Sequence, residues 1–386
     1  MYSRVCLLCI IVTLSLGYVA SKPGAEENDR IFSVNFDVIH PRDRFCKLMS
    51  NQSKCEVKLS GIMDAALVNN LDDAMRYIIT IKIGKKQQAF KVLLDTGADI
   101  LWVFSDECLD EEDENCEGHA KYELEEDKEY KIFKIGYADG EVSGVKVADE
   151  IHLATKLIVK DVMFGAAGEV NDEYEGYDGI MGLNMYLGDG EPSIIYYMIK
   201  QKLIKEPSYS IYLKGGATAV DGGEITFGGH NEKLVNLKID GVKAKMIAGG
   251  KTRTKMTSLK LGEEFFCGKD INKCIALLDT GNADMHVQKN FLDKINSILK
   301  PGDDGLVDCK TRESTPAIEI MFGKHLITLE AKYYIQEDDR ECFSTIKLND
   351  FGEDFDWSFG VPLFVKYYVQ FDFKAKNEAI CFYAKL

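Results

Sequence analysis

The chain has 386 residues, of which 46% are hydrophobic and 10% aromatic, and its formal net charge is −16. This length predicts about two domains, and the apolar content excludes a disordered chain because it is ample for a packed core. The acidic balance excludes nucleic acid and anionic membrane surfaces as expected partners, because phosphate binding requires a concentrated basic face.

The first 21 residues have the features of a secretory signal peptide. Arg4 gives the positive flank, residues 5–16 form the apolar stretch, and small residues up to Ser21 suit cleavage. The stretch is short for a membrane span, which needs about 20 residues. We therefore expect removal of residues 1–21, no membrane association afterwards, and a secreted or endolysosomal protein. The surplus of carboxylates, which lose charge in acid, favours an acidic compartment.

Residues 22–65 are irregular and contain scattered basic side chains. They fit a short pro-segment and equally fit an N-terminal strand region, and the pattern does not separate these interpretations. From Tyr77 the sequence changes character. Residues 77–84 and 89–94 are strand-like around a turn at 85–88, which predicts a hairpin.

The hairpin leads directly into Asp95-Thr96-Gly97, the first of two identical tripeptides. Further strand-like segments follow at residues 132–135, 142–147 and 157–164. Helical spacing of apolar residues occurs mainly at residues 193–203 and 289–299. Long strand-rich halves with few helices predict all-β lobes rather than parallel α/β units.

The second tripeptide, Asp279-Thr280-Gly281, lies 184 positions after the first (279 − 95 = 184), about the length of one domain. An acid–base pair needs two carboxylates close enough to share a proton, and a duplicated chain can supply one from each half. A second echo supports duplication. Gly182 follows Asp95 by 87 positions (182 − 95 = 87), after Ile180-Met181, and Gly360 follows Asp279 by 81 (360 − 279 = 81), after Ser358-Phe359. We expect these glycines to let strands approach closely beneath the catalytic loops.

Nine of the 11 cysteines remain after Cys6 and Cys9 leave with the signal peptide. Their spacing suggests local or regional pairs but does not fix the connectivity. Cys46 and Cys55 are candidates for a small loop, which leaves Cys381 unpaired. Its apolar neighbours indicate a buried hydrophobic residue rather than a reactive thiol.

Other catalytic chemistries have little support. Gly249-Gly250-Lys251-Thr252 resembles the end of a phosphate-binding loop, but Lys245 stands where the first Gly of that loop is required. We interpret the segment as an exposed β-turn. The sequence has no His-Glu-x-x-His and no Gly-x-Ser-x-Gly, so we expect neither a metal nor a cofactor.

From about Tyr77 to its C-terminus the chain resembles the pepsin-like aspartic proteases. Besides the two tripeptides, the resemblance rests on segments with the family's pattern: Trp102, Gly136-Tyr137-Ala138-Asp139-Gly140, Tyr177-Asp178-Gly179-Ile180-Met181-Gly182-Leu183, residues 222–229 and residues 367–372. It implies an all-β, bilobal double-β-barrel fold with few short helices. The N-terminal lobe would span residues 66–236 and the C-terminal lobe residues 237–386. One chain carrying both halves implies a monomer.

The resemblance implies an aspartic endopeptidase that acts on proteins or peptides at acidic to mildly acidic pH. The ionised member of the Asp95/Asp279 pair would activate a water, while the protonated member polarises the peptide carbonyl. Thr96 and Thr280 would hydrogen-bond across the lobe junction. The N–H groups of Gly97 and Gly281 would point toward the carboxylates.

Further roles follow from the same resemblance. Tyr137, with Gly140, would form the flap that closes over substrate, and Trp102 would support the site. Leu93, Tyr177 and Ile180 would line the primary side-chain pocket and favour large hydrophobic residues at the cleaved bond, although they equally suit the core. The resemblance also implies the disulfides Cys108–Cys116, Cys267–Cys274 and Cys309–Cys342.

Four positions depart from the family pattern. Ala98 replaces a frequent Ser, Asn282-Ala283 replaces the usual Thr-Ser, and Val361 stands where Asp is frequent. Fewer hydrogen bonds to the ionised pair should raise its pKa values, which predicts a less acidic optimum than that of a gastric enzyme. The alternative function is a catalytically silent relative that binds peptides or ligands in a retained cleft. Retention of both Asp residues, their glycines and Tyr137 favours activity.

Overall fold

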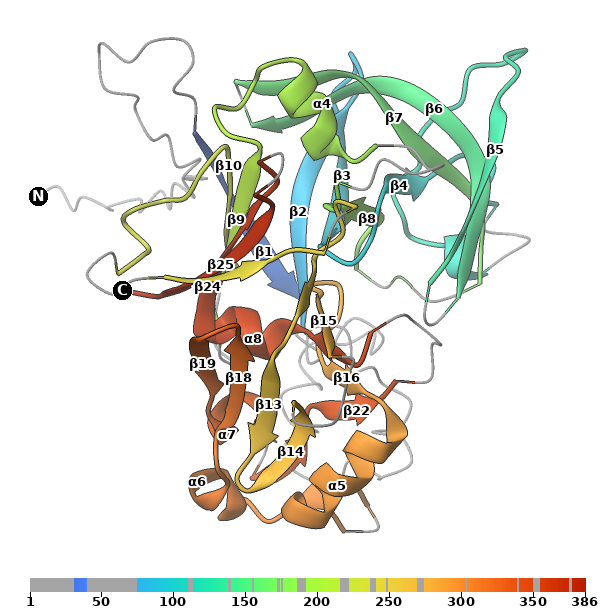
Figure 1. Cartoon of the computed structure of the whole chain (residues 1–386). Coiled ribbons are helices and arrows are strands. Elements are labelled where there is room, and N and C mark those ends of the chain that lie inside the picture. The colour runs from blue at the N-terminus through green and yellow to red at the C-terminus, as the bar shows by residue number, and fades with distance from the viewer. Residues whose placement is uncertain are drawn as a thin grey trace, which may run out of the picture.

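The computed structural model describes residues 31–39, 75–109, 114–137, 140–154, 156–171, 174, 176–185, 192–215, 222–236, 241–247, 249–268, 274–302, 304–338, 340–349, 355–374 and 377–386. The predicted signal peptide lies outside these residues, as do most of residues 22–65, Cys46, Cys55 and the flap residues Ala138 and Asp139. The described chain is mostly strand. Two lobes lie on either side of a sheet to which both contribute (Figure 1).

The first lobe is a closed barrel of six strands in the order β2-β3-β8-β4-β7-β6, with β6 pairing back to β2. Its strands are β2 Arg76–Ile83, β3 Gln88–Asp95, β4 Leu101–Phe104, β6 Glu141–Ala154, β7 Leu157–Val170 and β8 Gly179–Gly182. β5 (Lys131–Gly136) extends the sheet beyond β6, and the short helices are η1 (Glu114–Cys116) and α4 (Ile194–Lys200). The helix predicted over residues 193–203 is shorter than expected because Lys202 adopts a left-handed conformation with φ 56°, which ends it.

A sheet built from both halves joins the lobes. The first half contributes β1 Phe32–Ile39, β9 Ser208–Leu213 and β10 Gly223–Phe227, and the second contributes β11 Val242–Lys245, β24 Tyr367–Asp372 and β25 Ala379–Ala384. Their order is β11-β25-β24-β9-β10-β1, and the antiparallel pair β9–β24 crosses between the halves. β1 lies within residues 22–65 and pairs with both β10 and β2, so the described part of that segment is a strand.

The second lobe has several smaller sheets. Its strands are β12 Arg253–Lys255, β13 Ser258–Leu261, β14 Glu264–Cys267, β15 Ile275–Leu278, β16 Met285–Val287, β17 Leu306–Val307, β18 Ile318–Phe322, β19 His325–Leu329, β20 Ile335–Asp338, β21 Glu341–Ser344, β22 Ile346–Leu348 and β23 Trp357–Phe359. Its helices are α5 Lys289–Leu299, α6 Thr311–Ser314, α7 Ala331–Tyr334 and α8 Val361–Lys366. α5 has the bounds that its periodicity predicts, because Phe291, Ile295 and Leu299 recur every fourth residue and are buried.

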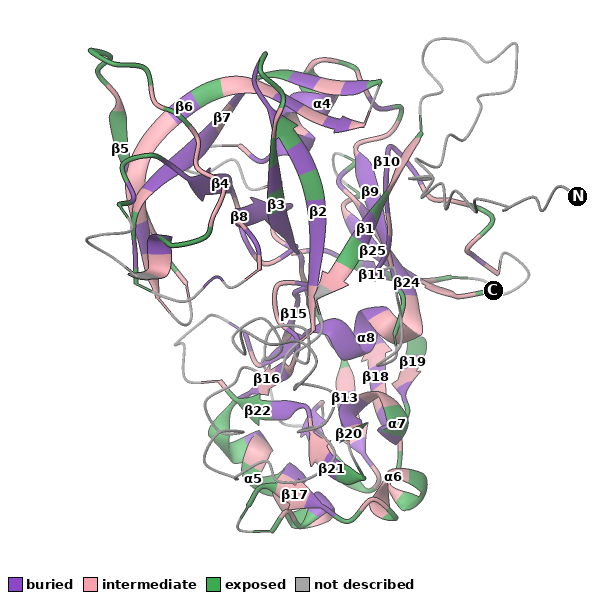
Figure 2. Ribbon diagram, turned by 180° about the vertical axis from the view of Figure 1, so that it is seen from behind, coloured by how far each residue is buried: buried purple, intermediate pink, exposed green. Residues whose placement is uncertain are grey.

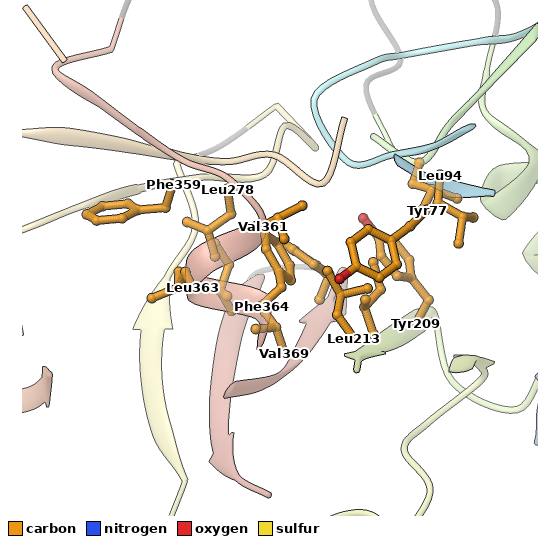
Figure 3. Packing of buried hydrophobic residues seen from close by; sticks show 14 of the residues in the cluster. Tyr77, Leu94, Tyr209, Leu213, Leu278, Phe359, Val361, Leu363, Phe364 and Val369 are labelled. Carbon is orange, nitrogen blue, oxygen red and sulfur yellow. The ribbon is translucent and has the colours of Figure 1, made fainter. Parts of the chain in front are cut away.

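One apolar core runs from the first lobe through the shared sheet into the second. Buried residues follow the inner strands of both lobes, and exposed ones follow the outer edges (Figure 2). Leu94 and Leu278, which immediately precede the two Asp-Thr-Gly tripeptides, belong to this core together with Tyr77, Tyr209 and residues of α8 (Figure 3). The loops that carry the two tripeptides are therefore supported by packed side chains, which limits their movement.

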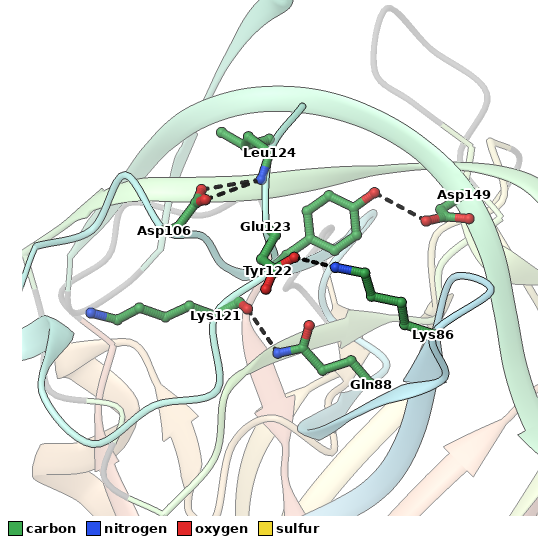
Figure 4. Close-up of polar contacts among 8 residues, drawn as sticks. All are labelled: Lys86, Gln88, Asp106, Lys121, Tyr122, Glu123, Leu124 and Asp149. Atoms are coloured by element: carbon green, nitrogen blue, oxygen red, sulfur yellow. Dashed lines mark hydrogen bonds and ion pairs between the residues drawn. The ribbon is translucent and has the colours of Figure 1, made fainter. Parts of the chain in front are cut away.

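Polar contacts fix the loop between β4 and β5 against the barrel (Figure 4). Tyr122 donates a hydrogen bond to Asp149 on β6 (3.0 Å), and Gln88 Nε2 donates to the carbonyl of Lys121 (2.8 Å). The Lys86–Glu123 ion pair is exposed, so it adds little stability.

Three disulfides are present among the described residues: Cys108–Cys116, Cys267–Cys274 and Cys309–Cys342. These are the pairs that the family resemblance implies. Cys381 is free and buried on β25, where burial raises the pKa of its thiol.

Candidate active site

The two tripeptides lie at the ends of corresponding strands. β3 ends at Asp95 and pairs in parallel with β8, where Asp95 is opposite Gly182. β15 ends one residue before Asp279 and pairs in parallel with β23, where Leu278 is opposite Phe359. The spacing of 87 and 81 positions noted in the sequence is therefore the register of these two pairings (182 − 95 = 87; 359 − 278 = 81).

Gly182 and Gly360, the glycines that follow the two tripeptides at similar offsets, lie where the surrounding backbone leaves little space. A Cβ on Gly182 would lie 2.5 Å from the amide nitrogen of Ile100, and one on Gly360 would lie 2.0 Å from the carbonyl oxygen of Asp284. Contacts this short leave no room for any side chain. The structure thus shows the close approach of backbone beneath the two Asp-Thr-Gly loops that the sequence predicts at these glycines.

Thr96 and Thr280 bind the two loops to each other reciprocally. The Oγ1 of Thr96 donates to the carbonyl of Leu278 (2.7 Å) and accepts from the amide of Thr280 (3.0 Å). The Oγ1 of Thr280 donates to the carbonyl of Leu94 (2.7 Å) and accepts from the amide of Thr96 (3.1 Å). All four bonds are buried, so water does not compete with them.

The carboxylates of Asp95 and Asp279 interact directly with each other, and each also lies against the glycine of the opposite loop, Gly281 or Gly97. Oδ1 of Asp95 also accepts from the amides of Gly97 (2.7 Å) and Ala98 (2.9 Å). Oδ1 of Asp279 accepts from the amide of Gly281 (3.0 Å). Each carboxylate is thereby held on one side by its own loop and on the other by its partner.

Burial and mutual proximity determine the charge of the pair. Asp95 and Asp279 are only 7% and 9% exposed. Burial, followed by the charge of Asp279, raises the pKa of Asp95 well above its ordinary value. Burial also raises the pKa of Asp279, and hydrogen bonds from Asp95, Gly281 and Asn282 partly offset this effect. Because the two carboxylates interact, their titration belongs to the pair rather than to either residue alone.

Three of the four departures from the family pattern have local explanations. The backbone amide of Ala98 donates to Asp95 where a hydroxyl is missing. Asn282 Nδ2 donates to Asp279 Oδ2 (3.2 Å). Val361 is 1% exposed and lies in the apolar core, and its amide donates to the carbonyl of Asn282 (2.9 Å). Both carboxylates thus keep hydrogen-bond donors, although Ala98, Ala283 and Val361 are apolar where the family pattern has side chains that can hydrogen-bond.

A sequence model of the eukaryotic aspartyl protease family matches residues 76–382. The chain belongs to this family. A vacuolar aspartic protease of Candida albicans is 30% identical over 312 residues, which cover 77% of this chain and 71% of that protein. Pepsin A of Gallus gallus is 26% identical over 316 residues (78% and 82%), and vacuolar protease A of Neurospora crassa is 28% identical over 303 residues (75% and 73%). The protein is a pepsin-like aspartic endopeptidase that acts on protein or peptide substrates.

In this protease, Tyr137 lies at the end of the hairpin that β5 and β6 form. The amide of Tyr137 donates to the carbonyl of Gly140 (2.7 Å) across the hairpin end. Trp102 Nε1 donates to the hydroxyl of Tyr137 (2.8 Å). Burial and the nearby Asp95 raise the pKa of Tyr137 above its ordinary value, so its hydroxyl stays protonated. The structure therefore brings Tyr137 and Trp102 together on the side of Asp95.

The three predicted pocket residues lie beside this pair. Leu93 and Ile180 are opposite each other in the β3–β8 pairing, and Tyr177 precedes β8. All three are less than 7% exposed and belong to a small apolar cluster with Trp102, against which Tyr137 packs. The cluster is separate from the main core and borders the end of the β5–β6 hairpin, where Tyr137 lies.

We expect Tyr137→Phe to lower kcat/KM by about tenfold. The change leaves the buried Trp102 N–H without its acceptor, and an unsatisfied buried donor costs about 1–3 kcal/mol. Steady-state kinetics on a peptide substrate measure the effect. Tyr122→Phe is the matched control, because it also removes a hydroxyl bonded to another side chain, but on the barrel surface. Equal losses in the two variants would contradict a role for the Trp102–Tyr137 bond.

Sequence reasoning missed two buried polar residues at the site, Asn184 and Thr252. Asn184 is 1% exposed and Thr252 is fully buried. The interpretation of residues 249–252 as an exposed β-turn was wrong at Thr252, because its backbone carbonyl accepts from Leu278 and draws the residue inside. In the described part of the chain, no three His, Cys, Asp or Glu side chains group as a metal site requires. None of the described helices is long and apolar enough to cross a membrane.

Proposed function

We propose that Asp95 and Asp279 are the catalytic residues of this endopeptidase and that they act as one acid–base pair on a water molecule. The observation that supports this most strongly is the direct contact between two buried carboxylates from opposite halves of the chain. Two carboxylates in such contact do not both ionise in mild acid, so one is a base while the other is an acid.

The mechanism follows from these two states. The ionised carboxylate accepts a proton from water as the water oxygen attacks the peptide carbonyl carbon. The protonated carboxylate donates to the carbonyl oxygen, which becomes a hydroxyl in the tetrahedral intermediate. The carboxylate that took the proton from water then gives it to the peptide nitrogen, while the other carboxylate takes back a hydroxyl proton. The C–N bond breaks, and a carboxylic acid and an amine leave. The amides of Gly97, Ala98 and Gly281 hold the carboxylates throughout, so little reorganisation is needed.

The apolar cluster beside the flap supports a preference for large hydrophobic residues at the cleaved bond. Leu93, Tyr177 and Ile180 present only aliphatic and aromatic surface there, apart from the Tyr177 hydroxyl. We assign Tyr137 and Gly140 to the flap that closes over substrate. Closure would exclude all water except the nucleophile.

The cellular setting is inferred from the sequence and from relatives named as vacuolar proteases and pepsin. We infer removal of the signal peptide, a secreted or endolysosomal location, and action as a monomer, since one chain supplies both carboxylates. Lobes of residues 66–236 and 237–386 would divide in the connection between β10 and β11. The charge of −16 gives no reason to expect nucleic acid as a partner.

Cleavage of an unfolded protein in acid, with and without a transition-state inhibitor of aspartic proteases, tests the proposal. We expect turnover that the inhibitor abolishes. Properly processed protein that shows no inhibitor-sensitive turnover would instead support the silent, ligand-binding alternative, which family membership and the retained site residues do not favour.

A further inference from the structure

Asn184 lies two residues after the end of β8, and every polar atom of its side-chain amide is paired. Its Nδ2 donates to the carbonyl of Gly97 (2.9 Å) and to Oδ1 of Asp99 (3.0 Å). Its Oδ1 accepts from the amide of Thr252 (3.0 Å). A flipped amide would place its oxygen against two other acceptors, so this network fixes the orientation of the side chain.

Thr252 continues the network to the second catalytic loop. Its Oγ1 lies 2.7 Å from the carbonyl oxygen of Thr96 and 3.0 Å from that of Leu278, so one hydroxyl proton is shared between the two loops. Its own carbonyl accepts from the amide of Leu278 (3.0 Å). A second hydrogen bond joins the segments that carry Asn184 and Thr252, because the amide of Met185 donates to the carbonyl of Gly250 (2.8 Å).

These contacts form a path that is distinct from the reciprocal Thr96–Thr280 bonds. It leads from Asp99 and Gly97 through Asn184 to Thr252, and from Thr252 to both Thr96 and Leu278. The carbonyls that it engages flank the two catalytic residues on their own loops. Because each bond is buried or nearly so, the path resists separation of the loops without competition from water.

We propose that Asn184 and Thr252 are positioning residues that lock the two catalytic loops together and thereby hold the Asp95 and Asp279 carboxylates in contact. The proposal rests on the catalytic role proposed above for that pair. Neither residue touches the reacting atoms. Both act through the loop backbone, where a small displacement of the carboxylates is enough to slow the reaction.

Thr252→Val tests the proposal because it keeps the shape of the side chain and removes the hydroxyl. We expect kcat to fall by about tenfold or more while KM stays within about twofold, since loosened loops harm the transition state more than substrate binding. Thr252→Ser restores the hydroxyl and should return kcat to within about threefold of the wild type. Asn184→Asp, which places a carboxylate against Asp99, should reproduce the loss.

Thr254→Val is the matched control. Thr254 is also buried, and its hydroxyl also donates to a backbone carbonyl, that of Lys245 (2.8 Å). Lys245 lies outside the two catalytic loops. Its kcat should stay within about twofold of the wild type even if its thermal stability falls as far as that of Thr252→Val. Equal losses of kcat per folded molecule in the two Val variants would overturn the proposal, because they would show only general destabilisation.

Amide hydrogen exchange gives a readout that does not require activity. Thr252→Val should accelerate exchange at Thr96 and Thr280, whose amides bond across the loops, and Thr254→Val should not. If the wild type fails to cleave any substrate, the proposed function falls, yet the exchange comparison still decides whether the loops are locked. Unchanged exchange in a folded Thr252→Val protein would overturn the positioning role.

Discussion

Asp95→Asn is expected to lower kcat by about 10³-fold or more while leaving the fold intact. The amide can keep the existing hydrogen bonds, because its Oδ1 still accepts from Gly97 and Ala98 and its Nδ2 can donate to Asp279. It cannot exchange a proton with water or substrate at mildly acidic pH. Asp279→Asn should be equally inactive, since a pair that shares one proton needs both members.

The double variant distinguishes a pair from two independent groups. If Asp95 and Asp279 work as one unit, the double Asn variant should be no slower than either single variant. Initial rates on a peptide, with circular dichroism to show folding, measure this. Asp106→Asn, at an acceptor on the surface of the first lobe, serves as control and should stay within about twofold of the wild type. Substantial activity in either single variant would exclude the proposed mechanism.

Gly97→Ala and Gly281→Ala should each reduce kcat by about 100-fold, because each adds a methyl group against the opposite carboxylate. A Cβ on Gly97 would lie 2.6 Å from Oδ2 of Asp279, and one on Gly281 would lie 2.6 Å from Oδ2 of Asp95. Real side chains do not approach so closely, so a carboxylate or a loop must move. Overpacking of this kind also destabilises a protein by about 1–3 kcal/mol.

The symmetry of the two losses is the informative part of this prediction. Each glycine crowds the carboxylate of the other half, so the two variants should be impaired to a similar degree in kcat and in thermal midpoint. Gly168→Ala is a suitable control, because its Cβ would meet a side-chain atom of Glu107 at 3.3 Å, where the neighbour can adjust. Full activity in folded Gly97→Ala protein would mean that the carboxylates do not face each other as described.

Much of the fold could be predicted because local patterns and long-range structure agree here. The hairpin of β2 and β3 and the helix α5 have periodic apolar residues that are buried as the pattern requires. The offset of 87 between Asp95 and Gly182 could be recognised because the register of β3 and β8 preserves it. The short helices α6 and α7 could not, since four residues are too few to show helical periodicity.

Away from the repeated tripeptides, the residues of the site were harder to predict from the sequence. Thr252 follows two glycines, a local pattern typical of an exposed turn, and only its contacts with Thr96 and Leu278 bury it. Those partners are 156 and 26 positions away, so no spacing rule connects them. Asn184 gave one usable signal. It follows the apolar run 180–183, where a buried amide needs partners of its own.

The pH dependence of kcat/KM for the wild-type enzyme tests the shared proton most directly. Below the lower pKa of the pair both carboxylates are protonated and no base remains; above the upper pKa both are ionised and no acid remains. Since burial and Asp279 raise the pKa of Asp95, the descending limb should lie above the ordinary pKa of an aspartate. We predict a bell-shaped profile with its maximum in acid. A profile with a single limb, or activity that persists undiminished into alkaline pH, would contradict a mechanism based on one proton shared by Asp95 and Asp279.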